Sequence, residues 1–210
     1  MTREDTEPAE AVATVDFIYG LESRYSYLAS TQIGRIARET GATFRWQPIS
    51  THALLARRAD DPFTPGALGQ YDWDYRRRDA EAWARHYGVP FNDPIGRLTH
   101  EPMLPALAAL AAGRQGRTDA MSHRLFRLIF VDDRTTFGPR EAMAEAVSLG
   151  LDVARFRADL DSVELAQEHE RRVLEVESRG VFGVPTFFYR DQLYWGNDRL
   201  VLLEDALRGD

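Results

Sequence analysis

The fold is constrained most by strand signals at the two ends of the chain, which enclose a long middle with helical patterns. Residues 13–19 are rich in β-branched and aromatic side chains and stop at Gly20, which predicts a buried strand. Apolar residues recur at helical spacing over residues 25–39, and residues 43–47 alternate before Pro48. This end therefore predicts strand, helix and strand, the crossover unit of a parallel sheet.

The C-terminal end predicts a hairpin and a closing helix. Residues 185–189 and 193–195 have strand character and are separated by a tight turn. Residues 198–207 are helical in pattern, and Asn197 or Asp198 is the expected cap. Together the two ends give the order βαβ–ββα, which is that of the thioredoxin core.

The middle of the chain predicts helices with little strand signal. We expect an α/β protein with a thioredoxin-like fold and a large inserted all-helical domain. The thioredoxin-like domain would comprise residues 12–51 and 181–210, the insertion residues 52–180, and residues 1–11 a disordered tail. The separate helices are expected at residues 71–87, 103–112, 119–131, 139–149, 153–160 and 162–178.

The chain of 210 residues contains no cysteine. It therefore forms no disulfide, offers no thiolate to a zinc ion and carries no thiol of its own for redox chemistry. Direct activity as a disulfide oxidoreductase is excluded.

The net charge of −7 argues against nucleic acid as a partner, because phosphate binding needs clustered Lys and Arg. The acidic N-terminus lacks the features of a secretory signal, and no apolar run approaches the roughly 18 residues that cross a bilayer. We expect a cytoplasmic protein with no membrane partner. The five histidines show no metal spacing, so we expect no metal site and assign them to solvent or to the core.

The sequence Ser23-Arg24-Tyr25-Ser26 follows the first strand and begins the first helix. A helix N-terminus offers free backbone N–H groups and a partial positive charge, which stabilise a bound thiolate. The segment taken alone favours a simpler role, in which Ser23 only caps the helix.

The second notable segment is Gly-Val-Phe-Gly-Val-Pro-Thr-Phe-Phe at residues 180–188. If the Val184–Pro185 peptide is cis, the Val184 backbone is exposed and pairs with an extended ligand as an added strand would. The alternative is an ordinary trans proline at the start of a strand. Periodicity does not separate the two.

These motifs, with Trp-Gly-Asn-Asp-Arg-Leu at residues 195–200, resemble those of the 2-hydroxychromene-2-carboxylate isomerases. That family is related to the kappa-class glutathione transferases within the DsbA-like branch of the thioredoxin superfamily. The resemblance covers both ends of the chain closely and the middle by pattern only.

The resemblance implies a glutathione site. Ser23 stands where the oxidoreductases have the first cysteine of Cys-x-x-Cys, and its hydroxyl would donate to the glutathione thiolate. The resemblance also implies a cis peptide before Pro185, with Val184 pairing to the cysteinyl backbone of glutathione. Asn197 and Asp198 fall where the family holds the γ-glutamyl end.

Two positions depart from the family pattern. Arg24 replaces a usual proline, and it would either favour an anionic substrate or face solvent. Asp60 is the nearest match to an asparagine that reaches glutathione, although an ionised Asp cannot donate the amide hydrogen bond. We take Asp60 as a candidate glutathione residue and Arg24 and Tyr25 as candidate substrate-binding residues.

The aromatic residues of the segment 71–87 favour a role in the helical core. If some of them face a cleft, Tyr75 and Trp83 are suited to be walls for an aromatic substrate.

The expected function is a glutathione-dependent isomerase that interconverts 2-hydroxychromene-2-carboxylate and trans-o-hydroxybenzylidenepyruvate. The mechanism would be thiolate addition, bond rotation and elimination. The partner would be a small aromatic carboxylate, and the family resemblance suggests a homodimer. The alternatives are a kappa-type glutathione transferase and a non-catalytic thioredoxin-fold binding protein.

Overall fold

The computed structural model describes residues 12–57 and 73–209. The predicted tail and the candidate residue Asp60 lie outside these ranges.

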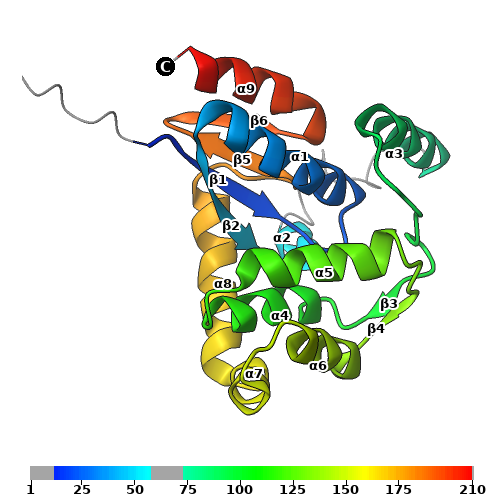
Figure 1. The fold of residues 1–210 in the computed structure, drawn as a ribbon. Coiled ribbons are helices and arrows are strands. Elements are labelled where there is room, and N and C mark those ends of the chain that lie inside the picture. The colour runs from blue at the N-terminus through cyan, green and yellow to red at the C-terminus, as the bar shows by residue number, and fades with distance from the viewer. Residues whose placement is uncertain (1–11, 58–72, 210) are drawn as a thin grey trace, which may run out of the picture.

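The central sheet has four strands in the order β2-β1-β5-β6 (Figure 1). β1 pairs with β2 in parallel and with β5 in antiparallel orientation, and β5 pairs with β6 in antiparallel orientation. This arrangement confirms the predicted thioredoxin-like core. The strands are β1 (Thr14–Tyr19), β2 (Thr43–Pro48), β5 (Thr186–Tyr189) and β6 (Gln192–Trp195).

Both faces of the sheet are covered, and β1 is buried at every position after Thr14. Its alternate side chains Phe17 and Tyr19 join the main core, while Ile18 packs in a second cluster with Val173 and Phe188. α1 (Arg24–Thr40) and α9 (Leu200–Arg208) lie together at the upper side of Figure 1, and α8 (Val163–Ser178) lies at the left. A parallel strand pair requires such a cover on each face.

The middle of the chain is helical, as predicted, with one difference. β3 (Thr99–His100) and β4 (Thr136–Phe137) form a short parallel pair, so the prediction of an all-helical insertion is wrong at these four residues. A pair this short gives no periodic signal in the sequence. The remaining helices are α2 (Thr51–Ala56), α3 (Trp73–Tyr87), α4 (Leu104–Gly113), α5 (Thr118–Phe130), α6 (Pro139–Ser148) and α7 (Val153–Leu160).

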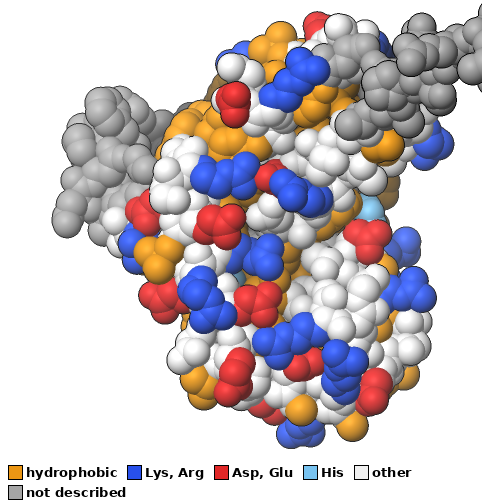
Figure 2. All heavy atoms as spheres, turned by 90° about the vertical axis from the view of Figure 1, so that its left-hand side faces the viewer, with side chains coloured by type: hydrophobic (Ala, Val, Ile, Leu, Met, Phe, Trp, Pro, Cys, Tyr) orange, Lys and Arg blue, Asp and Glu red, His pale blue; other side chains and the backbone are white. Residues whose placement is uncertain are grey.

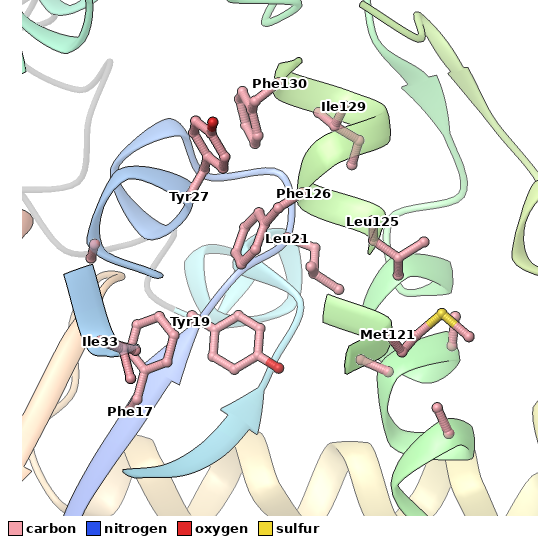
Figure 3. Close-up of a cluster of buried hydrophobic side chains, with 14 of the residues drawn as sticks. Phe17, Tyr19, Leu21, Tyr27, Ile33, Met121, Leu125, Phe126, Ile129 and Phe130 are labelled. Carbon is pink, nitrogen blue, oxygen red and sulfur yellow. The ribbon is translucent and has the colours of Figure 1, made fainter. Parts of the chain in front are cut away.

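The strands and the middle helices share one hydrophobic cluster. Figure 3 shows Tyr19 of β1 between Phe17 and the α5 side chains Met121, Leu125 and Phe126. The ring centroids of Tyr19 and Phe126 are 5.8 Å apart, so the inserted helices pack directly on the sheet. The domain boundaries drawn from the sequence remain a prediction.

The helix ends follow from individual residues. Gly41 ends α1 with φ of 72°, a left-handed conformation that glycine adopts without steric cost. At the C-terminal end, a 3₁₀ turn over Asn197–Arg199 precedes α9, whose cap position is Arg199. The prediction that Asn197 or Asp198 caps this helix is therefore wrong, because the extra turn shifts the start of the helix.

On the face shown in Figure 2, the basic side chains are interspersed with acidic ones. Opposite charges form ion pairs on the helices, such as Arg172 with Glu168 on α8. No helix in the described ranges is long and apolar enough to span a membrane. Nor do those ranges contain a cluster of His, Asp and Glu that would hold a metal ion.

Candidate functional site

A cleft of about 490 Å³ lies between the start of α1, one face of α3 and the C-terminal hairpin. It brings together Tyr25, the Val184–Pro185 peptide, Asn197 and Asp198, which the sequence had predicted as site residues. Ser23 and Arg24 are not part of its lining. Among the described residues, the lining is Tyr25, Tyr75, Arg76, Asp79, Trp83, Val184, Pro185, Trp195, Gly196, Asn197, Asp198 and Arg199.

Ser23 is the N-cap of α1, as predicted, and its role towards a thiolate remains a prediction. Its Oγ accepts a hydrogen bond from the Ser26 N–H at 3.2 Å, and its own N–H donates to the Gly20 carbonyl at 3.1 Å. Capping uses a lone pair of the hydroxyl and leaves its hydrogen for an acceptor. The cap therefore does not compete with donation to a thiolate at the same helix end.

The Val184–Pro185 peptide is cis, as the sequence resemblance implied. The Pro185 carbonyl accepts from the Gly196 N–H at 2.9 Å, which ties the start of β5 to the end of β6. Within the described residues, the Val184 N–H and C=O take part in no hydrogen bond. These two groups border the cleft and can pair with a ligand backbone.

Asn197 and Asp198 differ in what they offer to a ligand. Asn197 is only 3% exposed, and its amide nitrogen lies 3.4 Å from the Tyr87 hydroxyl, to which it donates. The Asp198 side chain is 47% exposed and lies 3.7 Å from the Arg199 guanidinium. Asp198 is therefore the more accessible of the two for an ammonium group.

Arg24 is buried, so the alternative that it faces solvent is wrong. Its side chain is 5% exposed and forms an ion pair with Asp93 at 3.0 Å. Burial lowers the pKa of Arg24, and Asp93 opposes this shift. Asp93 neutralises the Arg24 charge, which weakens the case for this residue as the ligand of a substrate anion. Its substrate-binding role remains a prediction.

The α3 side of the cleft is made of side chains. The Tyr25 hydroxyl donates to Asp79 Oδ2 at 2.8 Å, and the Arg76 guanidinium lies 5.3 Å from the centroid of the Tyr25 ring. Burial, reinforced by Asp79, raises the pKa of Tyr25 to about 12, so its hydroxyl keeps its proton. Tyr75 and Trp83 also line the cleft, as the alternative to a core role had predicted.

Sequence reasoning missed Arg76, Asp79 and Trp195 as lining residues and Glu22 as a half-buried acid. Arg76 and Asp79 stand three residues apart on α3, which places them on one helix face. The spacing of Arg76 and Asp79 is evident in the sequence, but nothing in the sequence indicated which face of α3 borders the cleft. Burial raises the pKa of Glu22 to about 7, and the only signal was its place directly before Ser23.

Comparisons with known proteins agree with this architecture. The family model of the DSBA-like thioredoxin domain matches residues 14–208. A 2-hydroxychromene-2-carboxylate isomerase from Sphingobium xenophagum is 30% identical, over 92% of this chain and 97% of that protein. The enzyme of the same name from Pseudomonas putida is 28% identical, over 92% of this chain and 93% of that protein.

Solved structures give the same result. A structure of 2-hydroxychromene-2-carboxylate isomerase superposes with a TM-score of 0.75 at 25% identity, covering 93% of this chain and 94% of that one. The cytosolic disulfide reductase DsbM from Pseudomonas aeruginosa, solved with GSH, shares the fold at a TM-score of 0.64 and 21% identity, over 93% and 99% of the two chains. The chain belongs to the DSBA-like thioredoxin family and, within it, to the 2-hydroxychromene-2-carboxylate isomerases.

Proposed function

We propose that this protein is a glutathione-dependent isomerase that interconverts 2-hydroxychromene-2-carboxylate and trans-o-hydroxybenzylidenepyruvate. The observation that carries the proposal is the meeting, in one cleft, of the start of α1, the Val184–Pro185 peptide and Asp198, in a chain without cysteine. The isomerase names of its relatives support the reaction class. The thiol must come from a ligand, because the chain has none of its own.

The residues present fit glutathione at three places. The hydroxyl hydrogen of Ser23 and the N–H groups at the start of α1 suit a thiolate. The Val184 N–H and C=O suit a peptide backbone, and the Asp198 carboxylate suits the γ-glutamyl ammonium group. Asn197 departs from the expected pattern because its amide already bonds to Tyr87. Asp60 remains a candidate and lies outside the described residues.

When bound, glutathione supplies a thiolate whose addition to the conjugated system, followed by rotation about the resulting single bond and elimination, interconverts the isomers. Ser23 would orient this thiolate and stabilise its charge through a hydrogen bond. Trp83, Tyr75 and Trp195 would enclose the aromatic ring of the substrate. Arg76 of α3 lines the cleft beside them, whereas Arg24 of α1 is not part of the lining.

The test is isomerase turnover measured with and without glutathione, in the wild type and in Ser23→Ala. We expect turnover to require glutathione and to fall strongly in the variant. Isomerase turnover that persists without glutathione would contradict the mechanism.

Two alternatives have distinct outcomes. A kappa-type transferase would conjugate glutathione to a generic aryl halide, whereas the isomerase would not. A binding protein without activity would neither turn over the isomers nor give heat in a titration with glutathione. We also propose that the protein is cytoplasmic. We further propose that it forms a homodimer, and analytical ultracentrifugation would test this oligomeric state.

A further inference from the structure

The turn before Ser23 holds a carboxyl group with one buried oxygen, which the proposed mechanism does not use. The Ser23 N–H bonds to the Gly20 carbonyl and closes this turn, in which Glu22 is the third residue. Glu22 Oε2 is buried and has no hydrogen-bond partner among the described residues, and the same holds for Thr51 Oγ1 at the start of α2. Buried polar atoms without hydrogen-bond partners cost free energy of folding and are rare, so these two oxygens need a physical explanation.

The two oxygens share a space that a glycine leaves open. A β-carbon at Gly20 would lie 2.0 Å from Thr51 Oγ1 and 3.3 Å from Glu22 Oε2. Any other residue at position 20 would have to displace the Thr51 hydroxyl. Gly20 therefore makes room for a polar pocket between the end of β1 and the start of α2.

Hydrogen bonds connect this pocket to the site expected to receive the thiol. The Gly20 N–H donates to Ser26 Oγ at 3.4 Å, and the Ser26 N–H donates to Ser23 Oγ at 3.2 Å. Ser26 is fully buried, so these contacts lie beneath the first turn of α1. Gly20, beside which the Glu22 carboxyl lies, is thus hydrogen-bonded to the first turn of α1, the turn that would stabilise a thiolate.

Among the four residues of the turn, Glu22 carries the titratable side chain. Burial raises its pKa to about 7, against the opposing effect of the backbone N–H groups of Glu22, Thr51 and Leu21. Among the described residues, no charged side chain contributes to this shift. From α8, His169 accepts a hydrogen bond from the Ser50 N–H at 2.9 Å, and burial lowers its pKa so that it stays neutral.

We propose that Glu22 takes up the proton that the glutathione thiol loses, so that the site binds a thiolate without net release of a proton. The S–H bond breaks, its electron pair stays on sulfur as the thiolate, and the Glu22 carboxylate becomes a carboxylic acid. The reverse occurs when glutathione leaves. A neutral Glu22 removes a like charge from the neighbourhood of the thiolate, which couples the two ionisations. This inference rests on the proposed function.

The experiment counts protons and thiolates separately. Glutathione is titrated calorimetrically into the protein at about pH 7.5, between the pKa of Glu22 and the usual thiol value of about 8.5. Buffers of different ionisation enthalpy give the protons released per site, and ultraviolet absorbance gives the thiolate formed. We expect the wild type to release well under half a proton per thiolate, and Glu22→Gln to release close to one. Glu164→Gln, at an exposed acid of α8, is the matched control and should behave as the wild type.

The outcomes separate this inference from the proposed function. A wild type that forms thiolate and releases one proton per site, as Glu22→Gln does, overturns the role of Glu22 and leaves the function intact. A wild type that shows no binding heat and no thiolate overturns both.

A second measurement checks Glu22 without glutathione and covers the case in which binding by the Gln variant is lost. A carboxyl whose pKa is raised by folding binds more protons in the folded than in the unfolded state between pH 4.5 and about 7. The stability of the wild type should therefore fall as pH rises through this window. Glu22→Gln should lack this part of the fall in denaturant titrations, and a Gln variant with the same pH dependence contradicts the proposal.

Thr51→Val provides an independent variant that keeps the carboxyl. Removing the neighbouring hydroxyl leaves Glu22 in a more apolar pocket, which should raise its pKa further and leave less carboxylate to accept a proton. The protons released on glutathione binding should then lie between the values of the wild type and Glu22→Gln. A value equal to that of the wild type contradicts the shared pocket.

Discussion

The two sides of the cleft are built in different ways. On the hairpin side, main-chain groups contribute to the surface beside side chains such as Asp198. These groups are the Val184–Pro185 peptide and Gly196, joined by the hydrogen bond from the Gly196 N–H to the Pro185 carbonyl. On the α3 side, the surface consists of long side chains from one helix face, with Arg76 and Trp83 among them. The hairpin side therefore offers fixed peptide groups in addition to side chains, whereas the α3 side offers side chains alone.

This difference suggests a division of labour. Peptide groups held by a sheet pair with any extended backbone, which suits the peptide part of glutathione. Side chains on a helix provide shape and charge that select one small molecule over another. We therefore expect changes on the thioredoxin side to affect glutathione, and changes on α3 to affect the choice of substrate.

The largest effect is expected at Ser23, on the thioredoxin side. Ser23→Ala removes the hydroxyl donor to the thiolate, and loss of one such donor lowers kcat by roughly 100- to 1,000-fold. It also removes the cap of α1, at a cost of about 1 kcal/mol in the free energy of unfolding. Steady-state kinetics and denaturant titration measure the two effects.

A matched control separates catalysis from capping. Ser162 caps α8 in the same way, because its side chain accepts from the Leu165 N–H at 3.1 Å. Ser162→Ala should lose about the same stability and keep full activity. Equal losses of activity in both variants would mean that Ser23 acts only as a cap.

The next effect concerns the main chain at Gly196. This residue has φ of 109°, where a side chain is strained, and a β-carbon there would lie 2.3 Å from Asp198 Oδ1. Gly196→Ala should cost about 1–3 kcal/mol in stability and weaken glutathione binding by roughly tenfold or more. Gly41→Ala is the control, since Gly41 has φ of 72° at the far end of α1. It should lose stability without losing affinity for glutathione in calorimetry.

The same contrast explains what the sequence could predict. The hairpin side was predicted through the family resemblance, which the motif around Val184 and Pro185 carries, whereas the residue pattern alone left a cis and a trans peptide open. The α3 side was predicted only as an alternative, because Tyr75 and Trp83 have the spacing of an ordinary core face. The ion pair of Arg24 with Asp93 joins positions far apart in the sequence. Local sequence patterns do not reveal such a pair, and solvent exposure of Arg24, one of the two alternatives, was therefore wrong.

A smaller effect is expected at Arg76, on the α3 side. Arg76→Ala should raise KM for an anionic substrate by roughly tenfold and leave kcat and glutathione affinity nearly unchanged, because it removes charge from the cleft wall. The control Arg77→Ala changes the next residue, which is exposed and pairs with Asp74, and should have no effect on KM. A neutral ester of the substrate should be insensitive to both variants. Loss of glutathione affinity in Arg76→Ala would contradict the division between the two sides.

The smallest effect is expected where the two sides meet, at Tyr25. Tyr25→Phe keeps the ring on the cleft wall but removes the hydrogen bond from its hydroxyl to Asp79, which costs about 1 kcal/mol in stability. Since the pKa of Tyr25 is about 12, its hydroxyl is a donor throughout the working pH range, and the pH profile of kcat should not change.

Tyr27→Phe is the control, because the Tyr27 hydroxyl donates to the Pro90 carbonyl and Tyr27 does not line the cleft. Both variants should lose similar stability. Only Tyr25→Phe should raise KM, by a few fold, because the Asp79 carboxylate can then turn towards Arg76 and reduce the attraction of Arg76 for an anionic substrate. A shift in the pH profile of Tyr25→Phe would instead make Tyr25 a proton donor and move part of the chemistry to the α3 side.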